Sequence, residues 1–316
     1  MIELTFKNKL IKSLLVIFDA EGSTEIVSWQ ELAIEYRYER PTPLLKKSLS
    51  DDLNALFRGA KKAGVENIYL LDGHSVGNNI ALADLDSNGL NIFLQNETLE
   101  NLESFAKKSD CAAIIAAHGK YGSQDGVPPL LRDEFEKKLK TGLGHVFLFT
   151  IKNLYLNGIS VGESIFLTNL FKDLDLPVIF FTGSKAAIDE VNKFFKEVRT
   201  VATKDGKKKY DFNTVRKKIE EEIYDAVLNA QLGKGFVSLT DPRFNYKSTM
   251  IEFKKSTNPH YKNIIEEDIN YFRRLKGEFD LAISNKKVTI LPKNLSKPYL
   301  EIYRILDKVM NESFGE

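Results

Sequence analysis

Three short apolar runs in the first half of the chain each lead into residues of the kinds that bind metal ions. These residues are Asp19 and Glu21 after residues 14–18, Asp72 and His74 after residues 67–71, and His118 after residues 111–117. Imidazole nitrogens and carboxylate oxygens are common ligands of zinc and other divalent cations. A single D-x-E-G turn or a lone histidine is more often structural, but their repetition after successive apolar runs indicates metal-dependent chemistry.

The apolar runs themselves predict how these residues are positioned. A short apolar run bounded by turn residues is typical of a buried strand, and strands buried on both faces belong to parallel sheets. Ligands of open parallel sheets bind beyond the carboxyl ends of the strands. We therefore expect the carboxylates and imidazoles to meet at one edge of the sheet.

Two further candidates follow later in the chain. Glu163 lies near the start of an expected helix at residues 160–171, where the helix dipole alone also favours a glutamate. His145 begins a strand-forming run that ends at the turn Asn157-Gly158. Its position alone indicates a residue at a strand edge rather than a catalytic residue.

The order of expected elements predicts an α/β fold with a mostly parallel sheet flanked by helices. Helices are expected at residues 51–63 with Ser50 as N-cap, at 99–107 and at 185–195, with a further strand at 176–183. Residues 1–197 are expected to form the metal-binding catalytic domain, with an inserted segment at 119–144. Residues 198–316 are expected to form a smaller α+β domain that begins with a hairpin around Asp205-Gly206.

Composition limits the classes of partner and compartment. The net charge of +1 gives no reason to expect nucleic acid or an anionic membrane as a partner. A single cysteine, Cys111, allows no intrachain disulfide, and no segment has the length of a membrane span. We therefore expect a cytoplasmic protein.

Several motifs in the chain resemble the M55 family of metallopeptidases, which are D-aminopeptidases. The family's D-x-E-G and V-S-W elements correspond to residues 19–22 and 27–29, and its N-D-S-H motif corresponds to residues 71–74. The N-G-x-x-V-G-E motif is matched in full at residues 157–163. His145 precedes Asn157 by twelve positions, which is where the family has its catalytic histidine.

The resemblance implies a dinuclear zinc aminopeptidase that releases amino-terminal residues, including D-amino acids, from dipeptides or short peptides. The metal ligands that it implies are Asp19, Glu21, His74, His118 and Glu163. It implies His145 as nucleophile or general acid/base and Asp72 as a residue that orients His74 or a bound water, although a turn-capping role suits Asp72 equally well. It also implies a ring-like homo-oligomer, and manganese or cobalt remain open as alternatives to zinc.

The chain departs from the family pattern around the expected ligands. Leu71 and Gly73 replace the asparagine and serine beside His74, and Ala117 replaces an aromatic residue before His118. The segment between His118 and His145 is longer than is usual in the family. These differences leave the ligand set intact and bear on the substrate.

Two other functions remain open. One is a metal-dependent peptide-binding protein without turnover, and the other is a different dinuclear metallohydrolase such as a phosphoesterase, because paired metal ions also serve phosphate chemistry. The absence of a glycine-rich phosphate loop from the sequence argues against the phosphoesterase.

Overall fold

The computed structural model describes residues 9–32, 40–75, 77–120, 122–123, 147–148, 150–206, 208–237, 242–246, 248–255 and 259–314. Its larger sheet has the strand order β3-β2-β1-β4-β7-β8-β9, and all neighbours are parallel except β8 and β9. The strands are β1 Ser13–Phe18, β2 Asn67–Asp72, β3 Asn91–Asn96, β4 Cys111–Ala117, β7 Val178–Ser184, β8 Arg199–Asp205 and β9 Lys208–Lys209. The expected parallel sheet is confirmed.

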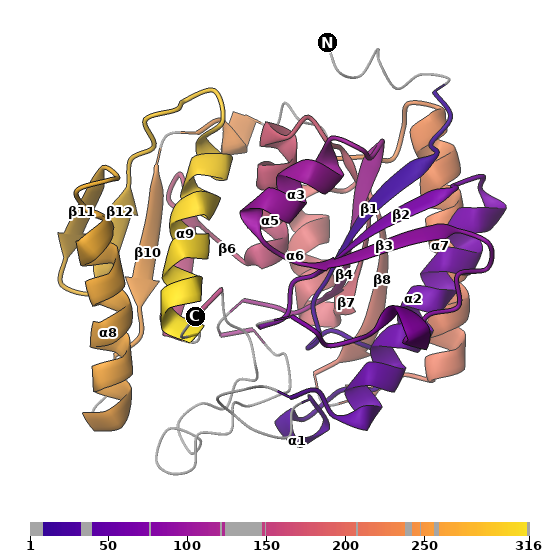
Figure 1. Ribbon diagram of the computed structural model, residues 1–316, viewed down its shortest axis with the longest axis horizontal. Helices are drawn as coiled ribbons and strands as arrows, with labels where there is room; N and C mark the ends of the chain where they lie inside the picture. The colour runs from indigo at the N-terminus through magenta and orange to yellow at the C-terminus, as the bar shows by residue number, and fades with distance from the viewer. Residues whose placement is uncertain are drawn as a thin grey trace.

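Helices cover both faces of this sheet (Figure 1). Alternate residues of β1 point to opposite faces, so that Val16 lies in one apolar core and Ile17 in another. The helices on the Val16 face are α2 Pro43–Lys62 and α7 Phe212–Gln231, and those on the Ile17 face are α3 Leu99–Ala106, α5 Glu163–Asp173 and α6 Lys185–Phe194. Burial on both faces explains why the central strands are almost wholly apolar.

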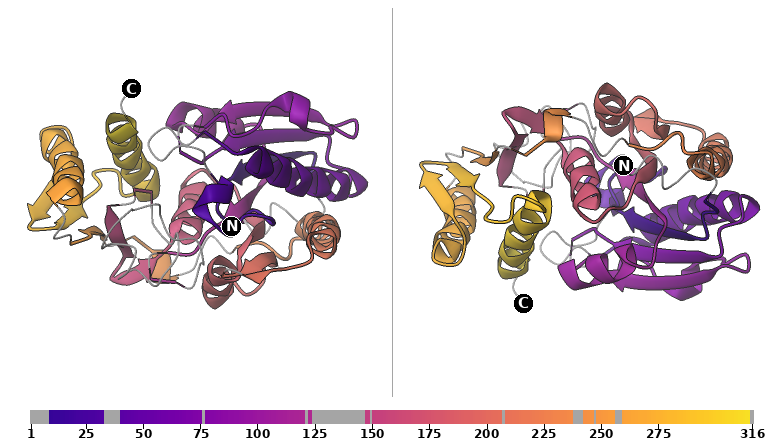
Figure 2. Two further views of the ribbon diagram at one scale, coloured as in Figure 1. Left: turned by 90° about the horizontal axis from the view of Figure 1, so that it is seen from below. Right: turned by 90° about the horizontal axis from the view of Figure 1, so that it is seen from above.

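A second, antiparallel sheet lies beyond the helices of the Ile17 face (Figure 2). Its order is β11-β12-β10-β5-β6, with β5 Ile151–Leu156, β6 Ile159–Val161, β10 Thr249–Phe253, β11 Leu281–Ser284 and β12 Lys287–Ile290. The helices α8 Pro259–Leu275 and α9 Pro298–Phe314 pack with it, and α9 also contacts α3 and α5. Apolar residues of this sheet belong to the same core as those of the Ile17 face.

The sheets do not divide the chain at residue 197. Strands β8 and β9 and helix α7 all follow residue 197. Nevertheless, β8 and β9 belong to the larger sheet, and α7 packs against α2 and β8. Conversely, β5 and β6 precede it and belong to the antiparallel sheet. The boundary of independently folding units stays a prediction, but the two sheets interleave along the sequence.

Most expected elements are present, and the errors have local causes. Helix α2 begins at Pro43 rather than after Ser50, because the Thr42 hydroxyl caps it by accepting from the Leu45 N–H and Pro43 suits its first turn. Residues 159–161 form β6, so α5 begins at Glu163 rather than at residue 160. Strand β3 was not expected, since it is a polar edge strand with alternately exposed residues.

The strand order places a topological switch at β1. The chain runs from β1 outward to β2 and β3 and then crosses back to β4 on the other side of β1. In open α/β sheets the crevice at such a switch is the usual ligand site. The segment after β1 is held close to β4 there: the Gly22 N–H donates to the Ala116 carbonyl at 2.7 Å.

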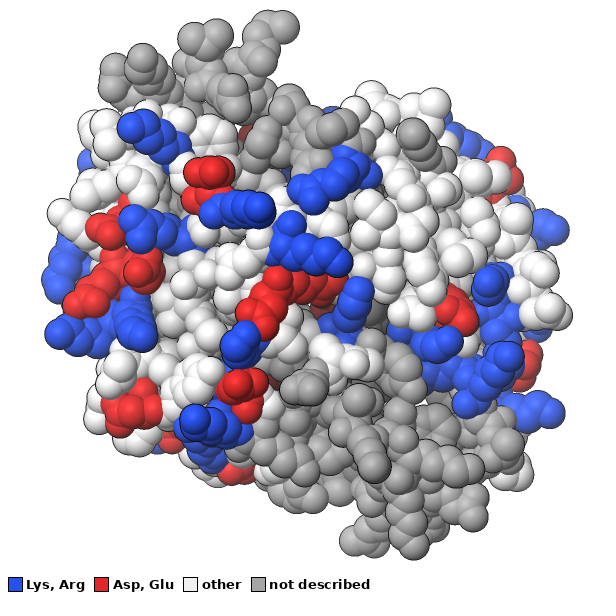
Figure 3. All heavy atoms as spheres, turned by 180° about the vertical axis from the view of Figure 1, so that it is seen from behind, with Lys and Arg blue, Asp and Glu red and all other residues white. Residues whose placement is uncertain are grey.

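In the part of the chain that the structure describes, no helix combines the length and apolar character needed to cross a lipid bilayer. The face shown in Figure 3 carries lysines and arginines interspersed with aspartates and glutamates.

The close approach of Gly22 to β4 leads us to expect that a larger residue at this position destabilises the fold. A Cβ at Gly22 would lie 2.2 Å from the Ala117 oxygen, and backbone of a central strand has little freedom to move away. We expect Gly22→Ala to lower the free energy of unfolding by about 1–3 kcal/mol or more. Urea unfolding of the purified variants measures this loss.

Gly277→Ala is the matched control. Apart from the residues next to it in the chain, no described residue has a heavy atom within 4 Å of the added methyl group, so the unfolding free energy should change by no more than about 0.5 kcal/mol. Equal stabilities of the two variants would contradict the proposed close packing at Gly22.

Candidate metal centre

Five side chains predicted from the sequence meet at the carboxyl edge of the parallel sheet. His74 Nδ1 lies 3.1 Å from both Asp19 Oδ1 and Glu21 Oε2. His118 Nε2 lies 3.3 Å from Asp19 Oδ2 and 3.6 Å from Glu163 Oε1. Side chains separated by up to 144 positions in the sequence therefore share one small volume, as the parallel topology requires.

Asp19 belongs to both halves of this group. Its carboxylate lies with Glu21 and His74 on one side and with His118 and Glu163 on the other, and within each set one ligand atom per residue lies within 4.8 Å of the others. Each set of two carboxylates and one imidazole suits a divalent cation of the zinc type. We name them the Glu21 set and the Glu163 set.

The Glu21 carboxylate provides a test of whether the group fits a cation. Glu21 is 2 % exposed. No hydrogen bond of good geometry from a described residue reaches either of its carboxylate oxygens, although His74 lies beside Oε2. Burying a carboxylate in this way is costly unless a cation compensates it. The buried acid and the mixed nitrogen and oxygen donors therefore fit a bound metal ion.

Strand β4 fixes the backbone of the first two carboxylates. The Asp19 N–H donates to the Ile115 carbonyl at 3.0 Å, and the Asp19 side chain accepts from the Ala20 N–H at 2.7 Å. Together with the bond from Gly22 to Ala116, these contacts turn the chain sharply at the end of β1. The turn brings Asp19 and Glu21, two positions apart, to the same side.

Asp72 and Asn79 hold the loop that carries His74. The Asp72 carboxylate accepts from the Asn79 N–H at 2.7 Å, from the Asn79 side-chain amide at 2.8 Å and from the His74 N–H at 3.3 Å. The Asn79 amide also donates to the His74 carbonyl at 2.8 Å. These contacts fix the backbone of His74, and they are those of a turn-capping carboxylate.

A left-handed residue precedes His118. Ala116 has φ +56°, its N–H donates to Thr182 Oγ1 at 3.0 Å, and the pairing of β4 with β7 shifts register at this point. Such strain at a non-glycine residue persists only where the surroundings enforce it, and it is frequent at functional sites. His118 Nδ1 lies 2.9 Å from the Gly119 carbonyl, so Nδ1–H donates there and Nε2 faces the carboxylates.

Glu163 reaches the group from the other sheet. It is the first residue of α5, after the short strand β6, and its carboxylate accepts from the Phe147 N–H. The Gly162 N–H, at the N-cap, donates to Glu190 Oε1 at 3.1 Å. The Glu163 set thus depends on the junction of β6 and α5.

Burial and close charges shift the pKa values within the group. Burial, followed by the charge of Glu21, raises the pKa of Asp19 to about 8. Burial acts to raise the pKa of Glu21, but the adjacent His74 lowers it well below the ordinary value. Burial favours neutral His118, yet the carboxylates of Glu163 and Asp19 raise its pKa well above the ordinary range. These opposed shifts are those of a compact charged cluster.

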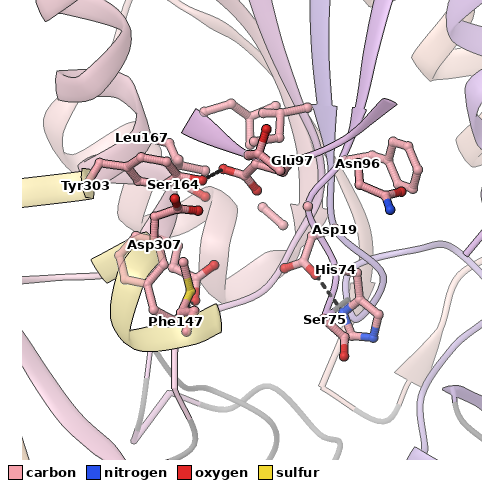
Figure 4. A pocket seen from close by; sticks show the side chains of 18 of the residues that line it. Asp19, His74, Ser75, Asn96, Glu97, Phe147, Ser164, Leu167, Tyr303 and Asp307 are labelled. Atoms are coloured by element: carbon pink, nitrogen blue, oxygen red, sulfur yellow. Dashed lines mark hydrogen bonds and ion pairs between the residues drawn. The ribbon is translucent and has the colours of Figure 1, made fainter. Parts of the chain in front are cut away.

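A cavity of about 190 Å³ opens onto the group. Figure 4 shows Asp19 and His74 on one wall, with Tyr303 and Asp307 of α9 on the other. The Tyr303 hydroxyl donates to Glu97, which follows β3. Burial raises the pKa of Glu97 to about 8, against the lowering effect of this hydrogen bond.

His145 lies outside the described residues, as does most of the segment at 119–144. Its role stays a prediction.

Three residues of the pocket were not predicted from the sequence: Glu97, Tyr303 and Asp307. Glu97 follows the edge strand β3, which lacks the apolar run that marks the other strand ends. Tyr303 and Asp307 come from a C-terminal helix with ordinary amphipathic spacing, so no local signal in the sequence distinguishes them.

Comparison with known proteins agrees with this geometry. The family model of peptidase M55, described as D-aminopeptidase, matches residues 13–130 and 135–265. Among solved structures, the fold is similar to that of the Zn-dependent D-aminopeptidase DppA from Bacillus subtilis, a self-compartmentalizing protease, with a TM-score of 0.69 and 16 % identity over 94 % of this chain and 98 % of that one. No curated protein sequence matches. The family match covers most of the chain, so this protein belongs to the M55 family and is a metallo-aminopeptidase.

Proposed function

We propose that this enzyme binds two zinc ions that share the carboxylate of Asp19 and that it removes amino-terminal residues from short peptides. The observation that carries the proposal is the membership of Asp19 in both the Glu21 set and the Glu163 set. Glu21 and His74 would hold one ion, and His118 and Glu163 would hold the other. The zinc dependence of the structural neighbour DppA supports the choice of metal.

The residues around the cations suit amide hydrolysis. Two metal ions on one carboxylate supply an activated water and polarise a scissile carbonyl when they are bound. The described residues of the cavity hold the substrate beside them and limit its exposure to bulk water. His145, from the segment that precedes β5, would act as nucleophile or as general acid/base, which suits an imidazole at neutral pH.

Two carboxyl groups of the cavity lining suit a free amino terminus. Glu97 lies beside Gly73, on the side of the cavity that carries Asp19 and His74, and Asp307 of α9 lies on the opposite side. An ammonium group bound there would favour the charged form of Glu97, which is otherwise disfavoured by burial. The described lining residues include no lysine or arginine, which disfavours the phosphoesterase alternative because a phosphate group would find no cationic side chain beside the metal ions.

We also propose an assembled enzyme. DppA is described as self-compartmentalizing, and its fold is shared over nearly the whole length of both chains. A closed homo-oligomer that acts in the cytoplasm and admits only short peptides agrees with this likeness.

The function can be tested with a panel of D- and L-aminoacyl dipeptides. We expect release of the amino-terminal residue, loss of release on treatment with a chelator, and its recovery when zinc is added back. His145→Ala should lower kcat by at least about 100-fold, as removal of a general acid/base does, and should retain the metal.

The same panel separates the alternatives. Stoichiometric binding of peptide without any product would indicate a binding protein, and turnover of a phosphoester without turnover of any peptide would indicate a phosphoesterase. Either result would contradict the proposed activity.

The raised pKa of Asp19 predicts a pH dependence of zinc binding. Below its pKa of about 8 the carboxyl retains a proton that a cation must displace. Zinc affinity should therefore rise with pH through about 8, with a further contribution from His118, whose raised pKa also keeps a proton that the cation displaces, and binding should release protons. Calorimetry in buffers of different ionisation enthalpy measures this release, and an affinity that does not change over this range would argue against Asp19 as a ligand.

The proposed ammonium contact predicts the effect of Glu97→Gln. The amide retains the shape of the side chain and can still accept from Tyr303, but it loses the charge that attracts an ammonium group. We expect KM for peptides with a free amino terminus to rise about tenfold, which corresponds to the loss of one charge-assisted hydrogen bond. Zinc content should not change. An unaltered KM would exclude Glu97 from binding the substrate.

A further inference from the structure

A lysine is fully buried beneath the turn that carries Glu21. Lys204 lies on β8 and is 1 % exposed. Its ammonium group donates to the backbone carbonyls of Glu21 and Ile26, and it lies 3.3 Å from the carbonyl of Ser23. An ammonium group has three donors to offer, and three carbonyls of one short loop converge on it.

The rest of this loop is anchored by β8 and by the helices α2 and α7. Thr203, next to Lys204, donates from Oγ1 to the Gly22 carbonyl at 2.6 Å. The Thr24 N–H and hydroxyl bind the buried carboxylate of Asp52 on α2. Arg216 of α7 in turn contacts Asp52 at 3.1 Å and Glu25 at 2.6 Å. Residues 21–26 are therefore held between β8, α2 and α7.

The Glu21 carboxylate depends on this backbone for its orientation. No hydrogen bond of good geometry from a described residue reaches its oxygens. Its direction is set mainly by where the main chain turns, and the main-chain carbonyl of Glu21 itself is one of the three that Lys204 holds. By contrast, Glu163 is positioned from β6 and α5, and the Asp19 N–H is held by Ile115 of β4.

We propose that Lys204 is a positioning residue for one of the two metal ions, the ion of the Glu21 set. This inference rests on the proposed function. It predicts that loss of the ammonium group weakens the two ions unequally, because the cradle of carbonyls supports Glu21 and not Glu163. A general loss of stability would weaken both.

Titration with Co²⁺ tests the inference, since each bound ion can be followed by its visible absorption and no turnover is required. The wild-type protein should bind two ions. Lys204→Met should retain one ion with little change and bind the other about 10–100-fold more weakly, which is the usual effect of removing a residue that supports a metal ligand. The matched control is Lys208→Met, which removes an exposed lysine of the same hairpin and should bind both ions as the wild-type protein does.

The outcomes separate the inference from the proposed function. If the wild-type protein binds no Co²⁺, the proposed function fails and the inference fails with it. If the wild-type protein and Lys204→Met bind two ions with equal affinity, or if the variant loses both equally, the role of Lys204 is overturned and the dinuclear centre stands.

Circular dichroism shows whether Lys204→Met folds. If it does not fold, a milder variant provides the test. Thr203→Val removes only the hydroxyl bond to the Gly22 carbonyl and preserves the volume of the side chain. It should weaken the same single ion by a smaller factor. Unchanged affinity for both ions in Thr203→Val, with Lys204→Met unfolded, would overturn the inference.

Discussion

The carboxylate of Asp19 makes contact with imidazoles on both of its sides, and the arrangement of the whole site follows from that contact. His74 contacts Oδ1 of Asp19 and also the Glu21 carboxylate, and His118 contacts Oδ2 of Asp19. Three carboxylates in so small and buried a volume repel one another, and burial adds a desolvation cost. Cations bound through Asp19, as we propose, would offset both costs.

The fold provides this contact through the backbone. Asp19 and His118 follow β1 and β4, the two strands on either side of the topological switch. The left-handed Ala116, the close approach of Gly22 and the buried ammonium of Lys204 all act on main-chain atoms next to the ligands. Ligand side chains held in this way need few hydrogen bonds of their own and remain available to a metal ion. Helices α5 and α9 then form the opposite wall of the cavity, and α9 supplies Tyr303.

Most of the sheet and the residues of the candidate metal centre could be predicted from the sequence because both have local signals. Apolar runs that end in Asp19, His74 and His118 identify buried strands and the residues at their carboxyl ends. The motif ending in Glu163 supplied the fifth residue, but the helix start was placed too early because the strand at 159–161 is short. Residues that act through distant contacts had no such signal. Lys204 lies in a hairpin with exposed lysines, and only its burial beneath residues 21–26 distinguishes it from them.

Anomalous diffraction at the zinc absorption edge, from crystals of the zinc-loaded enzyme, would show whether two ions bind at Asp19. We expect two peaks, one on each side of the Asp19 carboxylate, with Glu21 and His74 beside one and His118 and Glu163 beside the other. A single peak, or peaks that Asp19 does not contact, would contradict this expectation.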